Sequence, residues 1–194
     1  MRLAFFDFDG TLTTRDTILP LGLFLARSQS TRFLRVARLA GALLLLKLRV
    51  LSNHTFKEAF CRCLLRGESE ESIEDLSREF ATLHIPGILR APVVRMLDEH
   101  RRAGDEVYIV SSNFGFVLQQ LPPSLDTNGV IATEPEIVDG RYTGRLAGPA
   151  CAGPEKLARV LARFGRERVK QAVAYGDSKD DRQLLEFVKT SVWV

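Results

Sequence analysis

The stretch that most constrains the fold is residues 3–13, an apolar run that ends in two carboxylates, a glycine and a threonine. An apolar run without polar alternation is typical of a strand that is buried on both faces of a sheet. Asp7 and Asp9 stand two residues apart at the end of this run, so they start on the same side of the strand. The turn at Gly10 allows Asp9 to swing toward the group that Asp7 faces. The sequence therefore predicts a buried strand that delivers two acid groups to its carboxyl end.

The rest of the chain alternates between strand and helix patterns. Strands are predicted over 107–110, 130–132 and 172–175, with a last strand through Val192, and the Asp-Gly pair within 136–143 predicts a hairpin. Amphipathic helices are predicted over 93–103, 155–164 and 184–188. This alternation predicts an α/β fold, a Rossmann-like parallel sheet with helices on both faces that binds ligands beyond the carboxyl ends of its strands.

A helical insertion interrupts this pattern between the first and second strands. Apolar residues there recur at helical spacing, Ser52 supplies an N-cap, and Pro86 and Gly87 end the helical pattern. At 194 residues the chain has room for one core and a modest insertion. We therefore expect a core domain from residues 1–15 and 86–194, with a helical cap from residues 16–85 inserted into it.

The cap carries an unusual concentration of positive charge. Residues 27–66 hold nine Lys and Arg against one acid, although the whole chain carries only +3. Within 33–51 these basic residues flank an eight-residue uncharged run, which is too short to span a bilayer because that takes roughly twenty residues. One interpretation is a hydrophobic cap core with a solvated basic face, and the other is peripheral contact with an anionic membrane.

Cellular location and partners follow from what accompanies the first strand and the basic stretch. No basic and apolar leader precedes the first strand, so the sequence predicts a cytoplasmic protein, with the inner face of the membrane as the site of any peripheral contact. No stacking aromatics accompany the basic residues, which argues against nucleic-acid binding. The pattern makes no prediction of oligomeric state.

Four separated segments place a polar group at a strand end or a helix start. They are Asp7 with Asp9, Ser111, Lys156, and Asp177 with Asp181. Taken singly, a serine or aspartate at such a place is usually a helix cap, and a lysine on an amphipathic helix is usually solvated. Asp7 differs, because a carboxylate at the end of a buried run is costly without a cation or hydrogen-bond donors.

In order and spacing, these four segments resemble the four motifs of the haloacid dehalogenase (HAD) superfamily of phosphatases. The resemblance is nearest to subclass IB, the phosphoserine-phosphatase-like branch, in which a helical cap lies between the first and second motifs. The hairpin and the segments 151–156 and 175–178 are similar to bacterial subclass IB hydrolases, a group that includes phosphatidylglycerophosphatase C. The resemblance implies a phosphatase that acts on a small or lipid-linked phosphate ester.

The resemblance gives the first motif the central chemical role. It implies that Asp7 is the nucleophile that forms an aspartyl-phosphate, which divides a high barrier into two lower ones. Asp9 would protonate the leaving alkoxide and then take a proton from the attacking water. Dehalogenases have no alkoxide to protonate and lack this second Asp, so its presence here argues against dehalogenation.

The same resemblance implies a phosphate site and a metal site. Asp9, Gly10, Ser111, Ser112 and Lys156 would bind the phosphoryl group, with Lys156 also neutralising the charge of the transition state. The remaining implied roles concern the cation and its support. Asp7, the Asp9 carbonyl and Asp177 would hold Mg²⁺, supported by Asp181 and by Asp180, which replaces the Asn of phosphoserine phosphatases.

Substrate contacts from the cap are implied at two positions, Asp16 and Arg62, which match the amine-binding and carboxylate-binding residues of phosphoserine phosphatases. Two other functions remain open at this point. A phosphotransferase would pass the phosphoryl group from the aspartate to an acceptor alcohol in place of water. A non-enzymatic binding module is the alternative from outside the enzymes, although every motif residue is intact.

Overall fold

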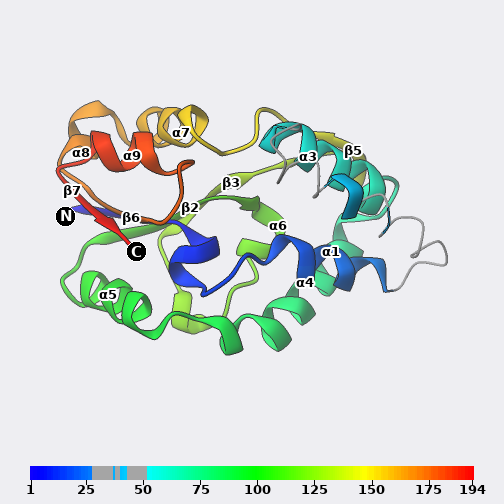
Figure 1. Ribbon diagram of the computed structural model, residues 1–194, viewed down its shortest axis with the longest axis horizontal. Coiled ribbons are helices and arrows are strands. Elements are labelled where there is room, and N and C mark those ends of the chain that lie inside the picture. Colours follow the sequence, from blue (N-terminus) through cyan, green and yellow to red (C-terminus); the bar gives the residue numbers. More distant parts are fainter. Residues whose placement is uncertain (28–36, 38–39, 43–51) are drawn as a thin grey trace.

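The fold is built on a five-stranded parallel sheet in the order β3-β2-β1-β6-β7 (Figure 1). This computed structural model describes residues 1–27, 37, 40–42 and 52–194. The strands of the sheet are β1 (Leu3–Phe6), β2 (Glu106–Phe114), β3 (Gly129–Thr133), β6 (Val173–Gly176) and β7 (Thr190–Trp193). The predicted parallel α/β fold is confirmed.

The central strand β1 is buried on both faces, as its apolar run predicts. Leu3 and Phe5 belong to one hydrophobic core, and Ala4 and Phe6 belong to the other. Phe5 and Phe6 are completely buried, and burying a side chain of this size contributes about 1.5–3 kcal/mol. Successive residues of β1 therefore pack alternately into the hydrophobic cores on the two faces of the sheet.

Helices cover both faces of the sheet (Figure 1). On one face, α5 (Ala91–Arg102) buries Val93 and Leu97 in the core that contains Phe6. The other face is covered by three helices, α7 (Pro154–Phe164), α8 (Arg166–Lys170) and α9 (Arg182–Phe187). Short turns complete the core: η1 (Phe8–Leu12) after β1, α6 (Gly115–Leu118) after β2, and η4 (Pro123–Leu125).

The second strand is longer than the sequence predicts. The predicted strand 107–110 continues to Phe114, because the pairing with β3 resumes at Phe114 and Thr133 after a register shift. The Thr133 hydroxyl donates to the Ser112 carbonyl at 2.7 Å and holds the shifted segment in place. Ser111 and Ser112 therefore lie within an irregular strand end, whereas the sequence places them just after the strand.

Among the described residues, the insertion includes the helices α1 (Ile18–Ala26), α3 (Asn53–Phe60), η2 (Cys61–Leu65) and α4 (Glu70–His84). The Ser52 hydroxyl accepts from the Thr55 N–H at 3.1 Å, so the predicted N-cap of α3 is confirmed. The apolar basic stretch 33–51 lies outside the described residues except for isolated positions near its middle. Within the described ranges, no helix combines the length and hydropathy that crossing a membrane requires.

The insertion leaves and re-enters the core at adjacent points. After η3 (Pro86–Ile88), the Thr14 N–H donates to the Ile88 carbonyl and the Arg90 N–H donates to the Leu12 carbonyl, both at 2.8 Å. The two connecting segments are therefore paired along their backbones. The predicted boundaries between core and cap, at residues 15/16 and 85/86, lie on the insertion side of this pairing.

The predicted hairpin is formed by β4 (Pro135–Val138) and β5 (Arg141–Leu146). Its turn places Asp139 and Gly140 at φ 51° and 70°, the conformation that an Asp-Gly pair favours. The hairpin, assigned to the core by sequence, pairs with the insertion: the Gly67 N–H donates to the Tyr142 carbonyl at 2.8 Å. The hairpin therefore supports the cap side of the molecule (Figure 1).

Candidate active site

A cavity of about 400 Å³ lies beyond the carboxyl ends of β1, β2 and β6, where a parallel sheet binds its ligands. Its core wall includes Asp7, Asp9, Lys156 and Asp177, and its cap wall includes residues of α1 and α3. Polar groups from all four sequence segments lie at or beside this cavity. The structure therefore brings the four predicted motif segments together.

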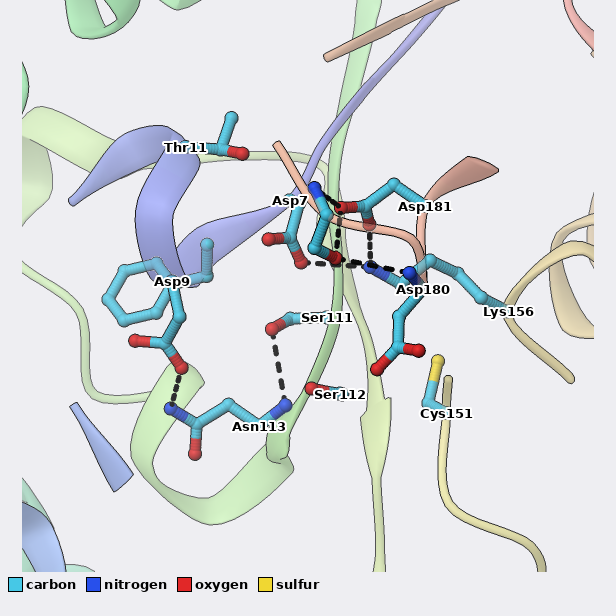
Figure 2. Close-up of polar contacts among 12 residues, drawn as sticks. Asp7, Asp9, Thr11, Ser111, Ser112, Asn113, Cys151, Lys156, Asp180 and Asp181 are labelled. Atoms are coloured by element: carbon cyan, nitrogen blue, oxygen red, sulfur yellow. Dashed lines mark hydrogen bonds and ion pairs between the residues drawn. The ribbon is translucent and has the colours of Figure 1, made fainter. Parts of the chain in front are cut away.

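Lys156 is buried between two carboxylates beside the cavity (Figure 2). Its Nζ donates to Asp7 Oδ1 at 2.9 Å and to Asp181 Oδ1, and the residue is only 1% exposed. Burial alone would lower the pKa of the Lys156 ammonium, but the two carboxylates raise it above its usual range. Lys156 is therefore a permanent positive charge fixed against Asp7.

Burial and the Lys156 ammonium shift the pKa of the Asp7 carboxyl in opposite directions. Burial raises its pKa to about 6, and the adjacent Lys156 ammonium counteracts that increase. A carboxyl with this pKa is mostly ionised at neutral pH. The β1 register also fixes its position, because the Asp7 N–H continues the pairing with β6 and donates to the Tyr175 carbonyl at 2.9 Å.

Asp9 is held by Thr17 from the start of the insertion and by Asn113 from β2. Asp9 Oδ1 accepts from the Thr17 N–H at 2.8 Å and from its hydroxyl at 2.7 Å, and Asp9 Oδ2 accepts from Asn113 Nδ2 at 2.8 Å. Burial, with the neighbouring Asp16 carboxylate, raises the pKa of Asp9 to about 7, despite the Thr17 hydrogen bonds. A carboxyl group with a pKa near neutrality suits proton transfer in both directions.

Thr17 and Asn113 belong to the candidate site, and sequence reasoning missed both. Asn113 is completely buried, and its Nδ2 also donates to the Thr17 hydroxyl at 2.8 Å. Its place directly after the two serines of the second motif was the available signal. The signal was weak because an asparagine at a strand end usually serves a turn.

Asp181 organises the loop that carries Asp177. Its Oδ2 accepts from the Ser178 N–H at 3.0 Å, from the Ser178 hydroxyl at 2.8 Å and from the Asp177 N–H at 3.3 Å. Asp177 Oδ1 in turn accepts from the Thr11 hydroxyl at 3.1 Å. The carboxylate of Asp177 is thus aimed at the end of β1.

Gly10 permits that close approach. Its φ is 83°, and a Cβ at this position would lie 2.2 Å from Asp177 Oδ2. Only glycine meets both requirements, since other residues rarely adopt this φ and none can share that space. Gly10 therefore contributes by letting the turn after β1 come close to Asp177.

The acidic groups beside the cavity suit a hard cation. Asp7, Asp177 and Asp181 each offer a carboxylate oxygen, and these three atoms lie within 4.8 Å of one another. Oxygen ligands of this kind are preferred by Mg²⁺. Both oxygens of Asp181 already accept hydrogen bonds, Oδ1 from Lys156 and Oδ2 from its own loop. Asp7 and Asp177 each accept through Oδ1, so these two carboxylates are the better placed pair for an ion.

The two serines of the second motif occupy different places. Ser112 lines the cavity, whereas Ser111 is 1% exposed and its hydroxyl accepts from the Asn113 N–H at 3.2 Å. In Figure 2 the Ser111 hydroxyl lies between the Asp7 and Asn113 side chains. Both serines therefore lie beside Asp7, the predicted nucleophile.

The cap residues differ from the sequence expectation at one of two positions. Asp16 lines the cavity as expected, and its Oδ1 accepts from the Ile18 N–H at 2.7 Å. Arg62 is exposed on η2 and does not line the cavity. Lys57 of α3 supplies the buried cap cation, 4% exposed with its Nζ 4.7 Å from the centre of the Phe114 ring.

Lys57 faces several acids across the cavity. Burial lowers the pKa of its ammonium, while Asp9, Asp16 and Asp180 act in the opposite direction. Lys57 was missed from sequence because it adjoins the apolar face of an amphipathic helix, where lysine is usually solvated. Asp180 also faces this region, and its Oδ2 accepts from Asn53 Nδ2 at 3.1 Å.

Solved structures with this fold include two informative examples. A Bordetella pertussis protein of unknown function matches 99% of this chain and 89% of its own length, with 29% identity and a TM-score of 0.86. A phosphoserine phosphatase described as a phospho-aspartyl intermediate analogue matches 99% of this chain and 85% of its own length, with 17% identity and a TM-score of 0.64. The second likeness concerns the fold alone.

Sequence relatives agree with the structural ones. Protein CicA of Caulobacter vibrioides is 31% identical over 185 residues, which cover 94% of this chain and 81% of CicA. A histidinol-phosphatase of Neisseria meningitidis is 34% identical over 134 residues, 65% of this chain and 60% of that protein. The family model described as haloacid dehalogenase-like hydrolase matches residues 4–186. The chain belongs to the haloacid dehalogenase-like hydrolase family.

Proposed function

We propose that this hydrolase is a Mg²⁺-dependent phosphomonoesterase that acts through a phosphorylated Asp7 on a small or lipid-linked phosphate ester. The observation that carries the proposal is Lys156, buried between Asp7 and Asp181 at the end of β1. An ammonium fixed there keeps Asp7 anionic and offers positive charge to a phosphoryl oxygen. The phosphatase named among the relatives supports the same class of reaction.

The proposed reaction has two steps at one phosphorus atom. Asp7 attacks phosphorus, forming an acyl-phosphate bond as the bond to the leaving alcohol breaks, and protonated Asp9 gives its proton to the departing alkoxide. Water then attacks the same phosphorus atom, Asp9 takes its proton, and Asp7 is regenerated with release of inorganic phosphate. A pKa of about 7 suits Asp9 to both transfers.

The surrounding groups stabilise charge on the phosphoryl oxygens. Lys156, the Ser111 hydroxyl and the Ser112 N–H are the proposed protein donors. A Mg²⁺ ion held by Asp7, Asp177 and the Asp9 carbonyl would supply electrostatic shielding between the anionic nucleophile and the anionic substrate. Asp181 is proposed to orient the loop that carries Asp177. Asp180 is proposed to hold the contact with Asn53 of the cap.

Phosphate release from a panel of esters tests this function, with soluble and lipidic substrates in parallel. We expect hydrolysis in Mg²⁺, none after treatment with EDTA, and recovery when Mg²⁺ is returned. Added alcohols provide the control for phosphotransfer, since ester formation that matches substrate loss would identify a transferase. Full activity of the EDTA-treated protein would overturn the metal assignment.

The pH dependence of stability gives a second readout of the same metal site. Without metal, burial raises the pKa of Asp7 to about 6 and of Asp9 to about 7, so the native chain binds more protons than the unfolded chain between these values and about pH 4. The free energy of unfolding therefore falls as pH rises through that window. Because Mg²⁺ competes with protons, we expect it to raise Tm more at about pH 8 than at about pH 5. An equal rise at both pH values would argue against binding at these carboxylates.

Asn113→Ala tests the proposed proton transfer. The change removes one donor to Asp9 and leaves its contacts with Thr17. We expect kcat to fall about 10-fold for an alkyl phosphate, whose leaving group needs a proton, and less for p-nitrophenyl phosphate. An equal loss for both esters would show that Asn113 supports the fold without positioning the acid.

A further inference from the structure

Asn53, at the start of α3, has one satisfied and one unsatisfied end. Its Nδ2 donates to Asp180 Oδ2 at 3.1 Å, linking the cap to the core wall. Its Oδ1 is buried and has no hydrogen-bond partner, the only such side-chain atom among the residues that the structure describes. Asn53 also lines the cavity that contains Asp7.

The neighbouring carboxylate fixes which end of the amide is left over. An ionised Asp180 accepts hydrogen bonds and donates none, so the NH₂ end of Asn53 must face it. The carbonyl end is thereby kept for another partner. A buried acceptor without a donor is costly, and native proteins retain few of them without a reason.

The position of Asn53 indicates which partner is missing. Asp7, Lys156 and Ser112 form the core wall, so the phosphoryl group of a substrate would lie against them. The leaving alcohol would then extend toward the cap wall, where Asn53 and Lys57 stand one helical turn apart on α3. Asn53 therefore lines the part of the cavity that would hold the alcohol, and its Oδ1 is an unpaired acceptor within that wall.

The charges of the cap wall bear on which chemical group of the leaving alcohol would contact Asn53. The buried Lys57 ammonium already faces the carboxylates of Asp9, Asp16 and Asp180. These acids offset part of the cost of burying the Lys57 ammonium, whereas Asn53 Oδ1 has no hydrogen-bond donor. A leaving group that offers only acceptors or only hydrocarbon would leave Asn53 Oδ1 unpaired.

We propose that Asn53 Oδ1 accepts a hydrogen bond from a hydroxyl or ammonium group on the leaving alcohol. The substrate class is then the phosphate esters of polyols or amino alcohols, in preference to simple alkyl phosphates. This inference rests on the phosphomonoesterase function proposed above, and it assigns Asn53 as a specificity-determining residue. A free polyol phosphate and the glycerol phosphate end of a lipid present the same hydroxyl.

Matched pairs of esters test the assignment. Glycerol 3-phosphate is compared with n-propyl phosphate, and phosphoethanolamine with ethyl phosphate, so that each pair differs in its donors. We expect kcat/KM to favour at least one donor-bearing ester by about 10-fold. The pair that shows the preference identifies the donor as hydroxyl or ammonium. For a hydroxyl donor, a glycerophospholipid phosphate in vesicles then separates the lipid from the free ester.

Two variants assign the preference to Asn53. Asn53→Ala should bring the ratio of kcat/KM values close to one, while Gln119→Ala, an exposed amide outside the cavity, should leave the ratio as in the wild type. Asp180→Asn should also lower the ratio, because its new amide can donate to Asn53 Oδ1 and satisfy it internally. Asp180→Asn keeps the Asn53 side chain, so it remains informative if Asn53→Ala folds poorly.

The outcomes distinguish a failure of this inference from a failure of the proposed phosphomonoesterase function. If the wild-type protein hydrolyses no phosphate ester, including p-nitrophenyl phosphate, the proposed function fails. If it hydrolyses both members of each pair with equal kcat/KM, only the inference fails. A preference that survives in Asn53→Ala would likewise overturn the role of Asn53.

Discussion

Asp7→Asn is expected to lower kcat by at least about 10⁴-fold, as removal of a covalent nucleophile does elsewhere. The amide has nearly the shape of the carboxylate but cannot attack phosphorus. Lys156 keeps Asp181 as an ionic partner, so the site should remain assembled. Initial rates of phosphate release measure the effect, and Asp75→Asn, on the exposed face of α4, is the matched control.

Stability gives the same variant a second, independent outcome. Because burial raises the pKa of Asp7, its ionised form is disfavoured by its surroundings. A neutral amide removes that cost, and we expect the Tm of Asp7→Asn to equal or exceed the wild-type value in metal-free buffer at neutral pH. Retention of more than about a tenth of the wild-type rate, with mass spectrometry excluding deamidation, would rule out the covalent mechanism.

Lys156→Met has the second large expected effect, because it damages both catalysis and folding. Loss of the charge opposite the phosphoryl oxygens should lower kcat by about 10²–10³-fold. The change also leaves Asp7 and Asp181 buried together without a cation, and breaking a buried pair of this kind costs about 3–5 kcal/mol. Chemical denaturation and phosphate release measure the two losses, with the exposed Lys170→Met as control.

A double variant separates the two roles of Lys156. Lys156→Met with Asp181→Asn removes one buried carboxylate together with the ammonium, so it should recover much of the lost free energy of unfolding. Its rate should stay low, because the positive charge beside Asp7 is still missing. Recovery of rate together with stability would mean that Lys156 acts only through the fold.

The part of the site that the sequence predicts is the part encoded locally. Asp7 and Asp9 follow a buried strand, and Lys156 and Asp177 lie at the start of a helix or the end of a strand in a parallel sheet, so topology alone brings them together. The central position of β1 follows equally from its unbroken apolar run. Periodicity and strand order are sufficient for these features.

The residues that the sequence did not reveal depend on contacts between distant segments. Thr17 and Asn113 meet at Asp9 although they are 96 positions apart, and Asn53 meets Asp180 across 127 positions. Lys57 is buried beside Phe114 and near acids that belong to other elements. Helical spacing cannot report such partners.

The basic residue of the cap that lines the cavity is not the one that the sequence resemblance implies. The sequence resemblance pointed to Arg62, yet Arg62 is exposed on η2 and Lys57 lines the cavity from the helix before it. The two residues are five positions apart, so their side chains leave the helical segment in different directions. Small differences in helix phase therefore decide which basic side chain reaches the cavity.

The paired connections between core and insertion bear on how such a protein could change during evolution. Arg90 Nη2 donates to the Gly10 carbonyl at 2.8 Å and its Nε donates to the Thr11 carbonyl at 3.2 Å, beside the backbone pairing already noted. An inserted segment therefore begins and ends where the core already holds its ends together. Since each doubling of a loop costs only about 0.6 kcal/mol in closure entropy, insertions of different length can be exchanged at this point while the register of β1 and β2 is preserved. New specificities can then arise by replacement of the insertion, with the reacting groups inherited unchanged.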